Sequence, residues 1–577
     1  MNEFILLHSQ TPQRSTVGHT IVLSKEWNVL IKNDDYSHFQ KNGKEYFVFG
    51  DLIAPKETLF QTKDKDIPKL KGNFHIIVIA GSTITVFTSF FSILPIYMSR
   101  DKKQISSSFS WIEELAPYPL RLDKKFILEQ LLFNYGLFNR TKYQEIQLLP
   151  SNSFVQLQHG TLSVLKHFEI TDFFKGTAKP KTASQLSELF IETSKSYFPD
   201  THFDIAFTSG FDGRTLVSCA HYHQKNFATF SFGRPENDDV SIPQKNAMAL
   251  GIPYRYFDLG APEYCNSGYL KNAYDFTNAN GIGNGFIYAH FPYSAKAIAK
   301  KSKYLLSGIC GSELFRALHS PGAVTSQAMI DIFKCDNDSV LRTQLKQSIT
   351  LVALHRQEFE TELDELVEEI VAFKAGLPQD ISLNQKFYTV VFEEIFRKFF
   401  GQWVAAQRQQ LHIRTPFLDF DFVTALLGSK YAGANNDFFT NNPLKRIKGQ
   451  LIYADIIGKT NRTIYRQKTG KGYTPRDVSN PLYRINIILP FFKKRLQRKV
   501  KKTYLDNLGI VSGIRQNKAT LMDLLNETTL FNTMELKKRL ADLSDFTPEK
   551  ERDMLLMSLA IVYNIRTKKT NLKLQSA

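Results

Sequence analysis

The sequence predicts an α/β protein of two parts, a β-rich N-terminal part and a parallel sheet covered by many helices. Between residues 46 and 165, pairs of short apolar runs are joined by glycine-containing turns, as in β-hairpins. Between residues 184 and 259, strand and helix patterns alternate, which favours parallel strands with helices on both faces. The length of 577 residues also exceeds what one compact core normally holds.

The N-terminal elements come first. Residues 46–50 form a short apolar run. Residues 73–80 and 83–87 predict a hairpin that turns at Gly81-Ser82. A second hairpin is expected at 154–158 and 162–165, with the turn at His159-Gly160, and a helix over Lys124–Asn134 lies between the two hairpins.

The second part begins after Gly176–Lys181, which has the composition of a linker. Beyond it the pattern alternates, and from Gln327 onward it is mostly helical. Phe392, Phe396, Phe399 and Trp403 recur at helical spacing, and we expect them in the core. The expected elements are helix 184–196, strand 204–207, a helix from about Arg214, strand 227–232, helix 240–250 and strand 254–259.

Composition restricts the class of protein. The chain is 43% hydrophobic and 22% charged, as in ordinary soluble proteins, and it has no unbroken apolar run of eighteen residues. Residues 84–98 favour paired strands over a membrane span. The first residues lack the pattern of a signal peptide, so a cytoplasmic location is expected. Four cysteines without metal-ligand spacing predict free thiols: Cys219, Cys265, Cys310 and Cys335.

The loop after strand 204–207 is the first candidate site. A strand that enters a glycine turn and then a helix presents backbone N–H groups to phosphate. Thr208, Ser209 and Gly210 are small enough for phosphate to approach. Asp212 suits a ligand of Mg²⁺ that bridges phosphates, and Arg214 suits a counter-charge. The loop lacks the spacing and the lysine of a Walker A loop. An ordinary strand–helix connection is the alternative interpretation.

Further motifs follow in order. Residues 208–214 resemble the SGGxDS signature of the asparagine-synthetase and PP-loop ATP pyrophosphatase family. The other segments that resemble this family are Phe230–Gly233, Asp239, Leu306–Phe315 (usually SGDGxDELF), Arg414–Asp419 (RxPFLD) and Arg466–Pro475 (RxKxGFxxP with a small insertion). In the N-terminal part, Leu70–Phe74, Ile93–Tyr97, Ile146–Pro150 and His159-Gly160 resemble the family's glutaminase domain.

The resemblance implies a fold and a site. The expected fold is an N-terminal Ntn-hydrolase-like β-sandwich (αββα) over residues 1–175 and a C-terminal PP-loop domain over 183–577. ATP and Mg²⁺ are the implied ligands, with Asp212 and Glu313 on the metal. Lys468, His412 and Arg466 are the implied catalytic residues. The implied nucleotide-binding residues are Phe207, Thr208, Ser209, Gly210, Asp212, Gly213, Arg214, Phe232, Ser307, Gly308 and Ser312.

Three positions depart from the family's pattern. Residue 2 is Asn2, where the glutaminase has its cysteine nucleophile, so the N-terminal part is expected to be structural. Ile309 and Ser312 stand where asparagine synthetases carry acids. The chain thereby resembles β-lactam synthetase and the lasso-peptide cyclases. His412 occupies the place that this resemblance associates with proton transfer, and a histidine packed beside the site is the alternative.

The expected function is ATP-dependent amide formation, in which a small-molecule or peptide carboxylate is adenylated and then transferred to an amine. Lasso-type macrocyclisation is one version of it. A non-catalytic scaffold and ammonia-dependent asparagine synthesis are the alternatives, and a homodimer stays open.

The net charge of +17 is concentrated late in the chain. Residues 466–502 contain twelve Lys or Arg and one acid. A solvated helix face is the ordinary interpretation of such a run, and contact of residues 491–502 with an anionic surface or an acidic substrate is the functional one. No nucleic-acid recognition motif accompanies the charge, so specific nucleic-acid binding is not expected.

Overall fold

The computed structural model describes most of the chain. The residues described are 3–11, 18–175, 179–316, 318, 322, 324–349, 354, 356–437, 448–483, 485–488, 490 and 506–575. Asn2, part of the expected linker and the basic run 491–502 lie outside these residues.

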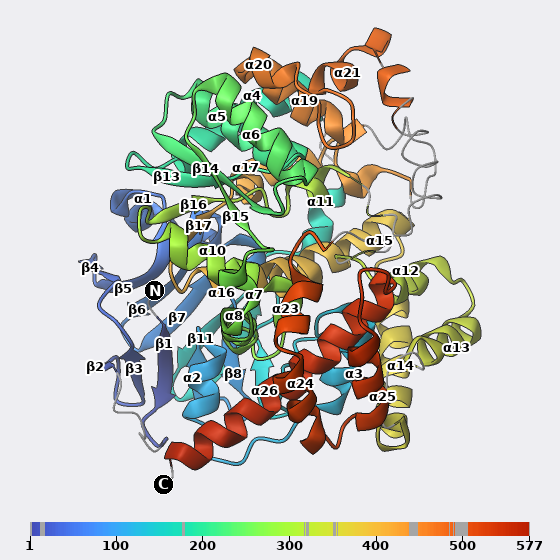
Figure 1. Cartoon of the computed structure of the whole chain (residues 1–577). Helices are drawn as coiled ribbons and strands as arrows, with labels where there is room; N and C mark the ends of the chain where they lie inside the picture. Colours follow the sequence, from blue (N-terminus) through green and yellow to red (C-terminus); the bar gives the residue numbers. More distant parts are fainter. Residues whose placement is uncertain are drawn as a thin grey trace.

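Two six-stranded antiparallel sheets form the N-terminal part (Figure 1). One has the order β10-β8-β9-β1-β3-β2 and the other β12-β11-β7-β6-β5-β4. Their bounds are β1 Phe4–His8, β2 His19–Val22, β3 Trp27–Ile31, β4 Ser37–Lys41, β5 Lys44–Leu52, β6 Gly72–Ala80, β7 Thr83–Thr88, β8 Tyr97–Ser99, β9 Gln104–Ser106, β10 Ile146–Leu148, β11 Ser153–Gln158 and β12 Thr161–Lys166.

The sheets face each other across an apolar core. Phe4, Phe47, Ile77 and Val155 are fully buried there. Period-two alternation puts one face of each sheet in this core and the other against helices. The outer faces are covered by α1 (Lys56–Gln61) and α2 (Phe109–Glu114). This αββα arrangement confirms the expected N-terminal fold class, including both hairpins.

A five-stranded parallel sheet lies in the second part, in the order β15-β14-β13-β16-β17. The predicted strand–helix alternation is confirmed within about two residues, except that α5 begins at Phe211, three residues before the expected start at Arg214. The strands are β13 Phe203–Ala206, β14 Phe227–Gly233, β15 Tyr254–Asp258, β16 Tyr304–Leu306 and β17 His412–Arg414. The helices on this sheet include α4 Ala183–Tyr197, α5 Phe211–Tyr222, α6 Asp238–Leu250 and α19 Lys448–Thr460.

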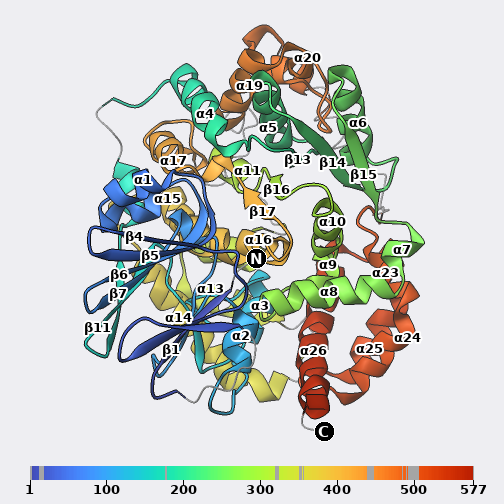
Figure 2. The same ribbon diagram turned by 90° about the vertical axis from the view of Figure 1, so that its left-hand side faces the viewer.

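The remaining helices surround both parts (Figure 2). Phe392, Phe396 and Phe399 lie buried in η5 (Val391–Phe400), as predicted, and Trp403 packs on the same core but is only partly buried. The largest core combines side chains from residues 90–137, which include α3, with side chains from helices later in the chain. These helices are α3 Lys124–Phe133, α8 Ser267–Ala279, α10 His290–Ile298, α12 Gln327–Lys334, α13 Asp338–Ile349, α14 Glu360–Ala375, α15 Leu383–Val390, η5 Val391–Phe400, α16 Gly401–Gln407, α17 Phe420–Leu427, α23 Ile510–Gln516, α24 Lys518–Leu524, α25 Thr533–Asp542 and α26 Glu549–Gln575.

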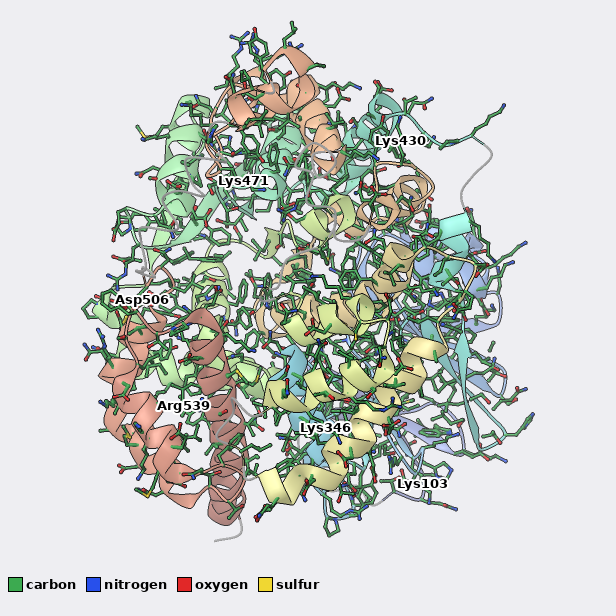
Figure 3. The ribbon with its side chains drawn as sticks, turned by 90° about the vertical axis from the view of Figure 1, so that its right-hand side faces the viewer. Lys103, Lys346, Lys430, Lys471, Asp506 and Arg539 are labelled. Carbon is green, nitrogen blue, oxygen red and sulfur yellow. The ribbon has the colours of Figure 1, made fainter. Side chains whose placement is uncertain are left out.

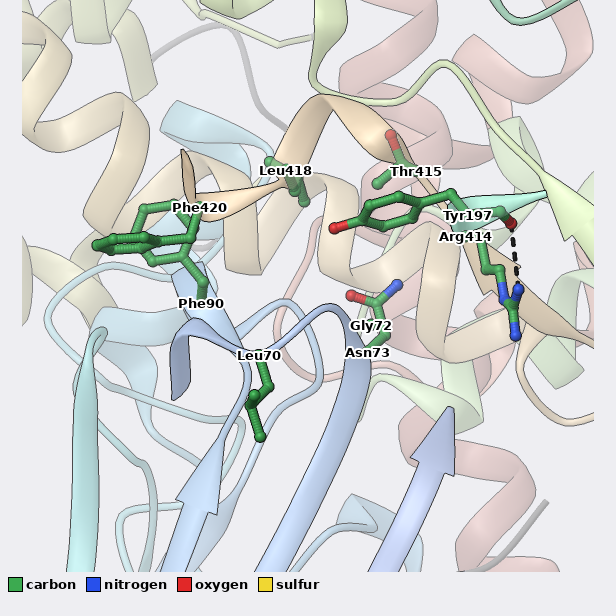
Figure 4. Close-up of a pocket in the computed structure, with 9 residues that line it drawn as sticks. All are labelled: Leu70, Gly72, Asn73, Phe90, Tyr197, Arg414, Thr415, Leu418 and Phe420. Carbon is green, nitrogen blue, oxygen red and sulfur yellow. Dashed lines mark hydrogen bonds between the residues drawn. The ribbon is translucent and has the colours of Figure 1, made fainter. Parts of the chain in front are cut away.

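Strand β17 joins the parallel sheet to the N-terminal sandwich. Asp51 of β5 accepts two hydrogen bonds from the Arg414 guanidinium, at 2.6 and 2.9 Å. The Asn73 amide donates to the Ile413 carbonyl at 2.7 Å. Arg414 also donates to the Tyr197 carbonyl at 3.1 Å, beside a small pocket at this junction (Figure 4). A buried, bidentate ion pair therefore fixes the two parts against each other.

Among the residues that the structure describes, no helix is both long enough and apolar enough to cross a membrane.

Candidate functional site

The two signature loops meet because β13 and β16 are neighbours in the sheet. In the order β15-β14-β13-β16-β17, chain order changes direction between these two strands. The loop after β13 carries Ser209 and Gly210, and the loop after β16 carries Ser307 and Gly308. Parallel strands end at a common edge, and the place where their order reverses leaves a crevice that takes ligands. The candidate site lies at this crevice.

Asp212, in the first turn of α5, contacts the second loop directly. Ser312 donates from its hydroxyl to one Asp212 carboxylate oxygen at 2.8 Å. Tyr453 of α19 donates from its hydroxyl to the other oxygen. A Cβ atom at Gly308 would approach the Asp212 Cβ to 2.5 Å, and one at Gly311 would approach the carboxylate to 2.7 Å. Glycine at both positions is what permits this close approach.

Glu313 is the second carboxylate at this edge, and it is 8% exposed. Burial and the nearby charge of Asp212 together raise its pKa to about 7, against the lowering effect of Arg316. Burial of Arg316 lowers its pKa, but the charges of Glu313 and Asp212 outweigh this effect and raise it. Two carboxylates thus lie close together at this edge, with Arg316 as the nearby positive charge.

These residues fit Mg²⁺ bound together with phosphate. Carboxylate oxygens are the ligands that this ion prefers, and it commonly uses one or two of them beside substrate phosphates. Each Asp212 oxygen has one hydroxyl donor from the chain and retains a second lone pair. Among the described residues, no cluster of three or more His, Cys, Asp or Glu could hold a metal without such help.

Ser209 at the tip of the first loop is bonded to Asp239 of α6. Its backbone N–H and its hydroxyl donate to one Asp239 oxygen, at 3.0 and 2.6 Å. The Gly470 N–H donates to the Ser209 carbonyl at 3.2 Å, and a Cβ at Gly470 would collide with the Ser209 hydroxyl at 2.3 Å. The late loop around residues 468–472 therefore packs on the first signature loop. Gly213 packs close to β13, since its Cβ would lie 2.7 Å from the Ala206 carbonyl.

Arg214 is fully buried, and its guanidinium faces the chain. It donates to the Lys468 carbonyl at 2.5 Å and to the carbonyls of Gln467 and Ser209 at 3.4 Å each. Burial lowers its pKa to about 10. We expected a counter-charge for phosphate, but the structure places this side chain where it holds the late loop. Asp212 and Arg214 are two positions apart on a helix, about 200° around its axis, so both cannot face the crevice.

Lys468 and Arg466 have exposed side chains on that late loop. The fixed Lys468 carbonyl places the start of its side chain next to the first signature loop. Phe207 is buried and accepts from the Ser231 hydroxyl through its carbonyl at 2.5 Å, and Thr208 accepts from the Gly210 N–H at 3.4 Å.

Phe232, at the end of β14, is partly exposed and packs against His290, with ring centroids 4.5 Å apart. Its other neighbour is Phe291, at 5.9 Å. His290 is buried, and burial lowers its pKa to about 3. The segment Phe230–Gly233 therefore ends in an apolar, uncharged surface beside the crevice.

His412 lies away from the residues at the crevice between β13 and β16. It pairs with Tyr304 at the beginning of β16, whereas the second signature loop follows Leu306 at the strand's other end. Its ring stacks on Tyr304 and lines a pocket with Asp51 and Arg408 at the junction with the sandwich. Burial lowers its pKa. The structure thus favours the alternative of a packed histidine over a proton-transfer residue in the crevice.

Tyr453 is the contact residue that sequence reasoning missed. It lies 241 positions from Asp212, in the middle of a buried helix. Its ring packs on Phe211, Phe315 and Phe417. No local pattern distinguishes it from any other core tyrosine.

Comparisons with known proteins agree with part of this description. Residues 200–432, less than half of the chain, match the family model described as asparagine synthase. No curated protein matches the chain.

Two solved structures are similar to part of the chain. One is the glutamine phosphoribosylpyrophosphate (PRPP) amidotransferase from B. subtilis complexed with ADP and GMP, at 9% identity and a TM-score of 0.17, covering 44% of this chain and 59% of that one. The other is described as the allosteric regulatory enzyme of purine biosynthesis, at 10% identity and a TM-score of 0.17, covering 44% and 58%. The chain spans less than two thirds of either.

Proposed function

We propose that this protein is an ATP-dependent enzyme that adenylates a carboxylate and transfers the acyl group to an amine. The asparagine synthase match over residues 200–432 fits an amide-forming, adenylating enzyme in general. The observation that carries the proposal is the joining of three segments at one sheet edge. Asp212 contacts Ser312 of the second loop, and Arg214 holds the carbonyl of Lys468.

The proposed chemistry needs two steps. A carboxylate oxygen of the substrate attacks the α-phosphorus of ATP, and the bond to pyrophosphate breaks. The amine then attacks the acyl carbon, loses a proton and displaces AMP. Both steps build negative charge near the α-phosphate, and the Lys468 ammonium would stabilise that charge. Mg²⁺, when bound at Asp212 and Glu313, would neutralise charge on the departing pyrophosphate.

We propose that the amine does not come from glutamine. No cysteine precedes Cys219, and residue 2 is Asn2, which carries no nucleophile. Residues 1–175 would then have a structural role, which is supported by the buried Asp51–Arg414 pair. The amine would belong to the same substrate, as in peptide macrocyclisation, or to a second one.

A non-catalytic scaffold is the second candidate, and one observation favours it. Asp239 accepts both donors that Ser209 would offer to phosphate, its N–H and its hydroxyl. A nucleotide has to displace this carboxylate or bind beside it. In the scaffold alternative Asp239 would keep the loop closed.

Release of pyrophosphate tests the proposal. The purified chain is incubated with Mg·ATP, the twenty amino acids, a set of sugar acids and short peptides, each with and without ammonium. We expect release by the wild type with some of these substrates and a loss of at least about 100-fold in Asp212→Ala and Lys468→Ala. Formation of asparagine from aspartate and ammonium would instead identify ammonia-dependent asparagine synthesis. Equal release by all three proteins would refute the assignment.

A further inference from the structure

The segment that begins after α19 presents cations and aliphatic side chains on one exposed surface. We define the 462–488 surface by its exposed members. They are Arg462, Arg466, Lys468, Lys471, Arg476, Leu482, Ile485 and Ile488. The run 491–502 lies outside the described residues and forms no part of this surface.

Contacts within the segment hold its parts together. Tyr465 beside Arg462 is hydrogen-bonded to Ser479, hydroxyl to hydroxyl, at 2.6 Å. Arg476 stacks over the Tyr483 ring at 4.3 Å and donates to its hydroxyl at 2.6 Å. The two helices involved, α20 (Arg462–Tyr465) and α21 (Pro475–Ser479), lie at the upper edge of the molecule in Figure 1.

Leu482 is the most exposed large apolar residue of the described chain, at 86%, and Ile485 and Ile488 follow at 64% and 40%. Ile485 and Ile488, three residues apart, lie on one side of the helical turn 485–488. Ile487 between them is buried, at 8%, and the Asn486 amide donates to Asp477 at 3.0 Å. The turn is therefore anchored from below, while its aliphatic side chains point outward.

The charge on this surface has one sign. Asp477, the single acid between residues 462 and 490, is buried in the cap of α21. Asp238 of α6 borders the surface at Gly470, with its Cβ 3.7 Å from a Cβ placed there. Within the described residues, no carboxylate forms an ion pair with Arg462, Arg466 or Lys468, whereas Lys459 on the neighbouring helix pairs with Glu188 at 2.9 Å.

We propose that the 462–488 surface docks on an anionic lipid membrane. Cations attract the anionic lipid headgroups, and each Lys or Arg side chain near the membrane surface strengthens binding about fivefold. Aliphatic side chains that protrude among cations gain by entering the boundary between headgroups and acyl chains, as amphipathic surface-binding segments do. A nucleic acid would use the cations but leave Leu482, Ile485 and Ile488 in water, since bases stack on aromatic rings. Because Lys468 belongs to the surface, docking brings the candidate site to the bilayer.

Flotation of the full chain with vesicles tests this proposal. The wild type should float with vesicles of phosphatidylcholine and phosphatidylglycerol (3:1) and remain behind with phosphatidylcholine alone. It should be released at 1 M salt, where screening is strong. The variant Leu482→Ser/Ile485→Ser/Ile488→Ser should bind at least about tenfold more weakly, since each aliphatic side chain contributes about this factor.

The matched control is Met534→Ser/Phe546→Ser, which removes side chains of 83% and 68% exposure. Met534 lies in α25, the helix of Arg539, at the opposite end of the molecule from Lys471 (Figure 3). This control should float like the wild type. Binding of Mg·ATP, measured by calorimetry, should be unchanged in both variants. A failure of membrane docking can therefore be distinguished from a failure of the proposed function.

Three outcomes would overturn the proposal. The wild type does not float with anionic vesicles, or the triple variant floats as well as the wild type. In the third outcome, the wild type binds single-stranded RNA in a gel-shift assay and does not bind the vesicles.

Discussion

The guanidinium of Arg214 donates to the main-chain carbonyl of Lys468 at 2.5 Å, across 254 positions of the chain. Asp212, two residues earlier on the same helix, receives hydroxyl donors from Ser312 and Tyr453. The first turn of α5 therefore contacts both the second signature loop and the late loop around residues 468–472.

Arg214→Lys should loosen the late loop, because an ammonium cannot reach the three carbonyls that the guanidinium fork contacts. We expect the free energy of unfolding to fall by about 2 kcal/mol. Pyrophosphate release should fall at least about 10-fold, since small displacements of a catalytic group are costly. Urea unfolding and initial-rate assays measure the two effects. Stability and rate both equal to those of the wild type would contradict this role.

Tyr453→Phe keeps the ring in its aromatic cluster and removes the hydroxyl that holds Asp212. We expect a rise of about fivefold in the Mg²⁺ concentration needed for half-maximal ATP binding, corresponding to one lost hydrogen bond of about 1 kcal/mol. Tyr473→Phe is the matched control, because its buried hydroxyl bonds Gln450 at 3.0 Å and not Asp212. The idea fails if both variants show the same Mg²⁺ dependence.

His290 should make the protein sensitive to acid. Burial lowers its folded pKa from 6.5 to about 3, so the unfolded chain binds the proton more tightly. Its contribution to stability is fully present above pH 6.5 and is lost as pH falls toward 3. At pH 5 the loss is about 2 kcal/mol. His290→Leu should lose less stability between pH 7.5 and 5 than the wild type, by this amount, in urea unfolding. Identical pH dependence would exclude the assignment.

Asp51→Asn should destabilise the junction between the sandwich and the parallel sheet. It leaves the buried Arg414 guanidinium without its bidentate partner, and removal of one partner of a buried pair costs about 3 kcal/mol. Glu368→Gln is the control, because it breaks the exposed pair with Arg342, where solvent screening leaves little to lose. Denaturant unfolding of both variants checks the comparison, and equal losses would contradict it.

Part of the candidate site could be predicted from the sequence, and part of it depends on packing that the sequence pattern does not show. Asp212 was predicted at the site from the strand–turn–helix loop and the family resemblance, and Ser312 from the resemblance alone; their contact follows from the neighbouring places of β13 and β16 in the sheet. Tyr453 was missed because its contact depends on the docking of α19, which no local pattern encodes. His412 was expected at the site because it precedes Arg414 by two residues, yet two strand residues span about 6.6 Å and place it toward the other end of β17.

Arg214 shows the same limit on a helix. Its place beside the loop in sequence suggested a phosphate contact, and the helical period directed it elsewhere. The antiparallel sandwich was predicted in its hairpins, β6–β7 and β11–β12. Strands β1 to β3 have weaker patterns, and their pairing depends on contacts distant in sequence, such as β1 with β9.

Calorimetric titration with Mg·ATP tests the central claim most directly, since it needs no knowledge of the acyl substrate. The account predicts saturable, Mg²⁺-dependent binding to the wild type and at least about tenfold weaker binding to Asp212→Asn, which keeps the shape of the side chain but removes its charge. Asp275→Asn, at an exposed ion pair with Lys296, should bind like the wild type. Absence of binding to the wild type, or equal binding to Asp212→Asn, would contradict the account.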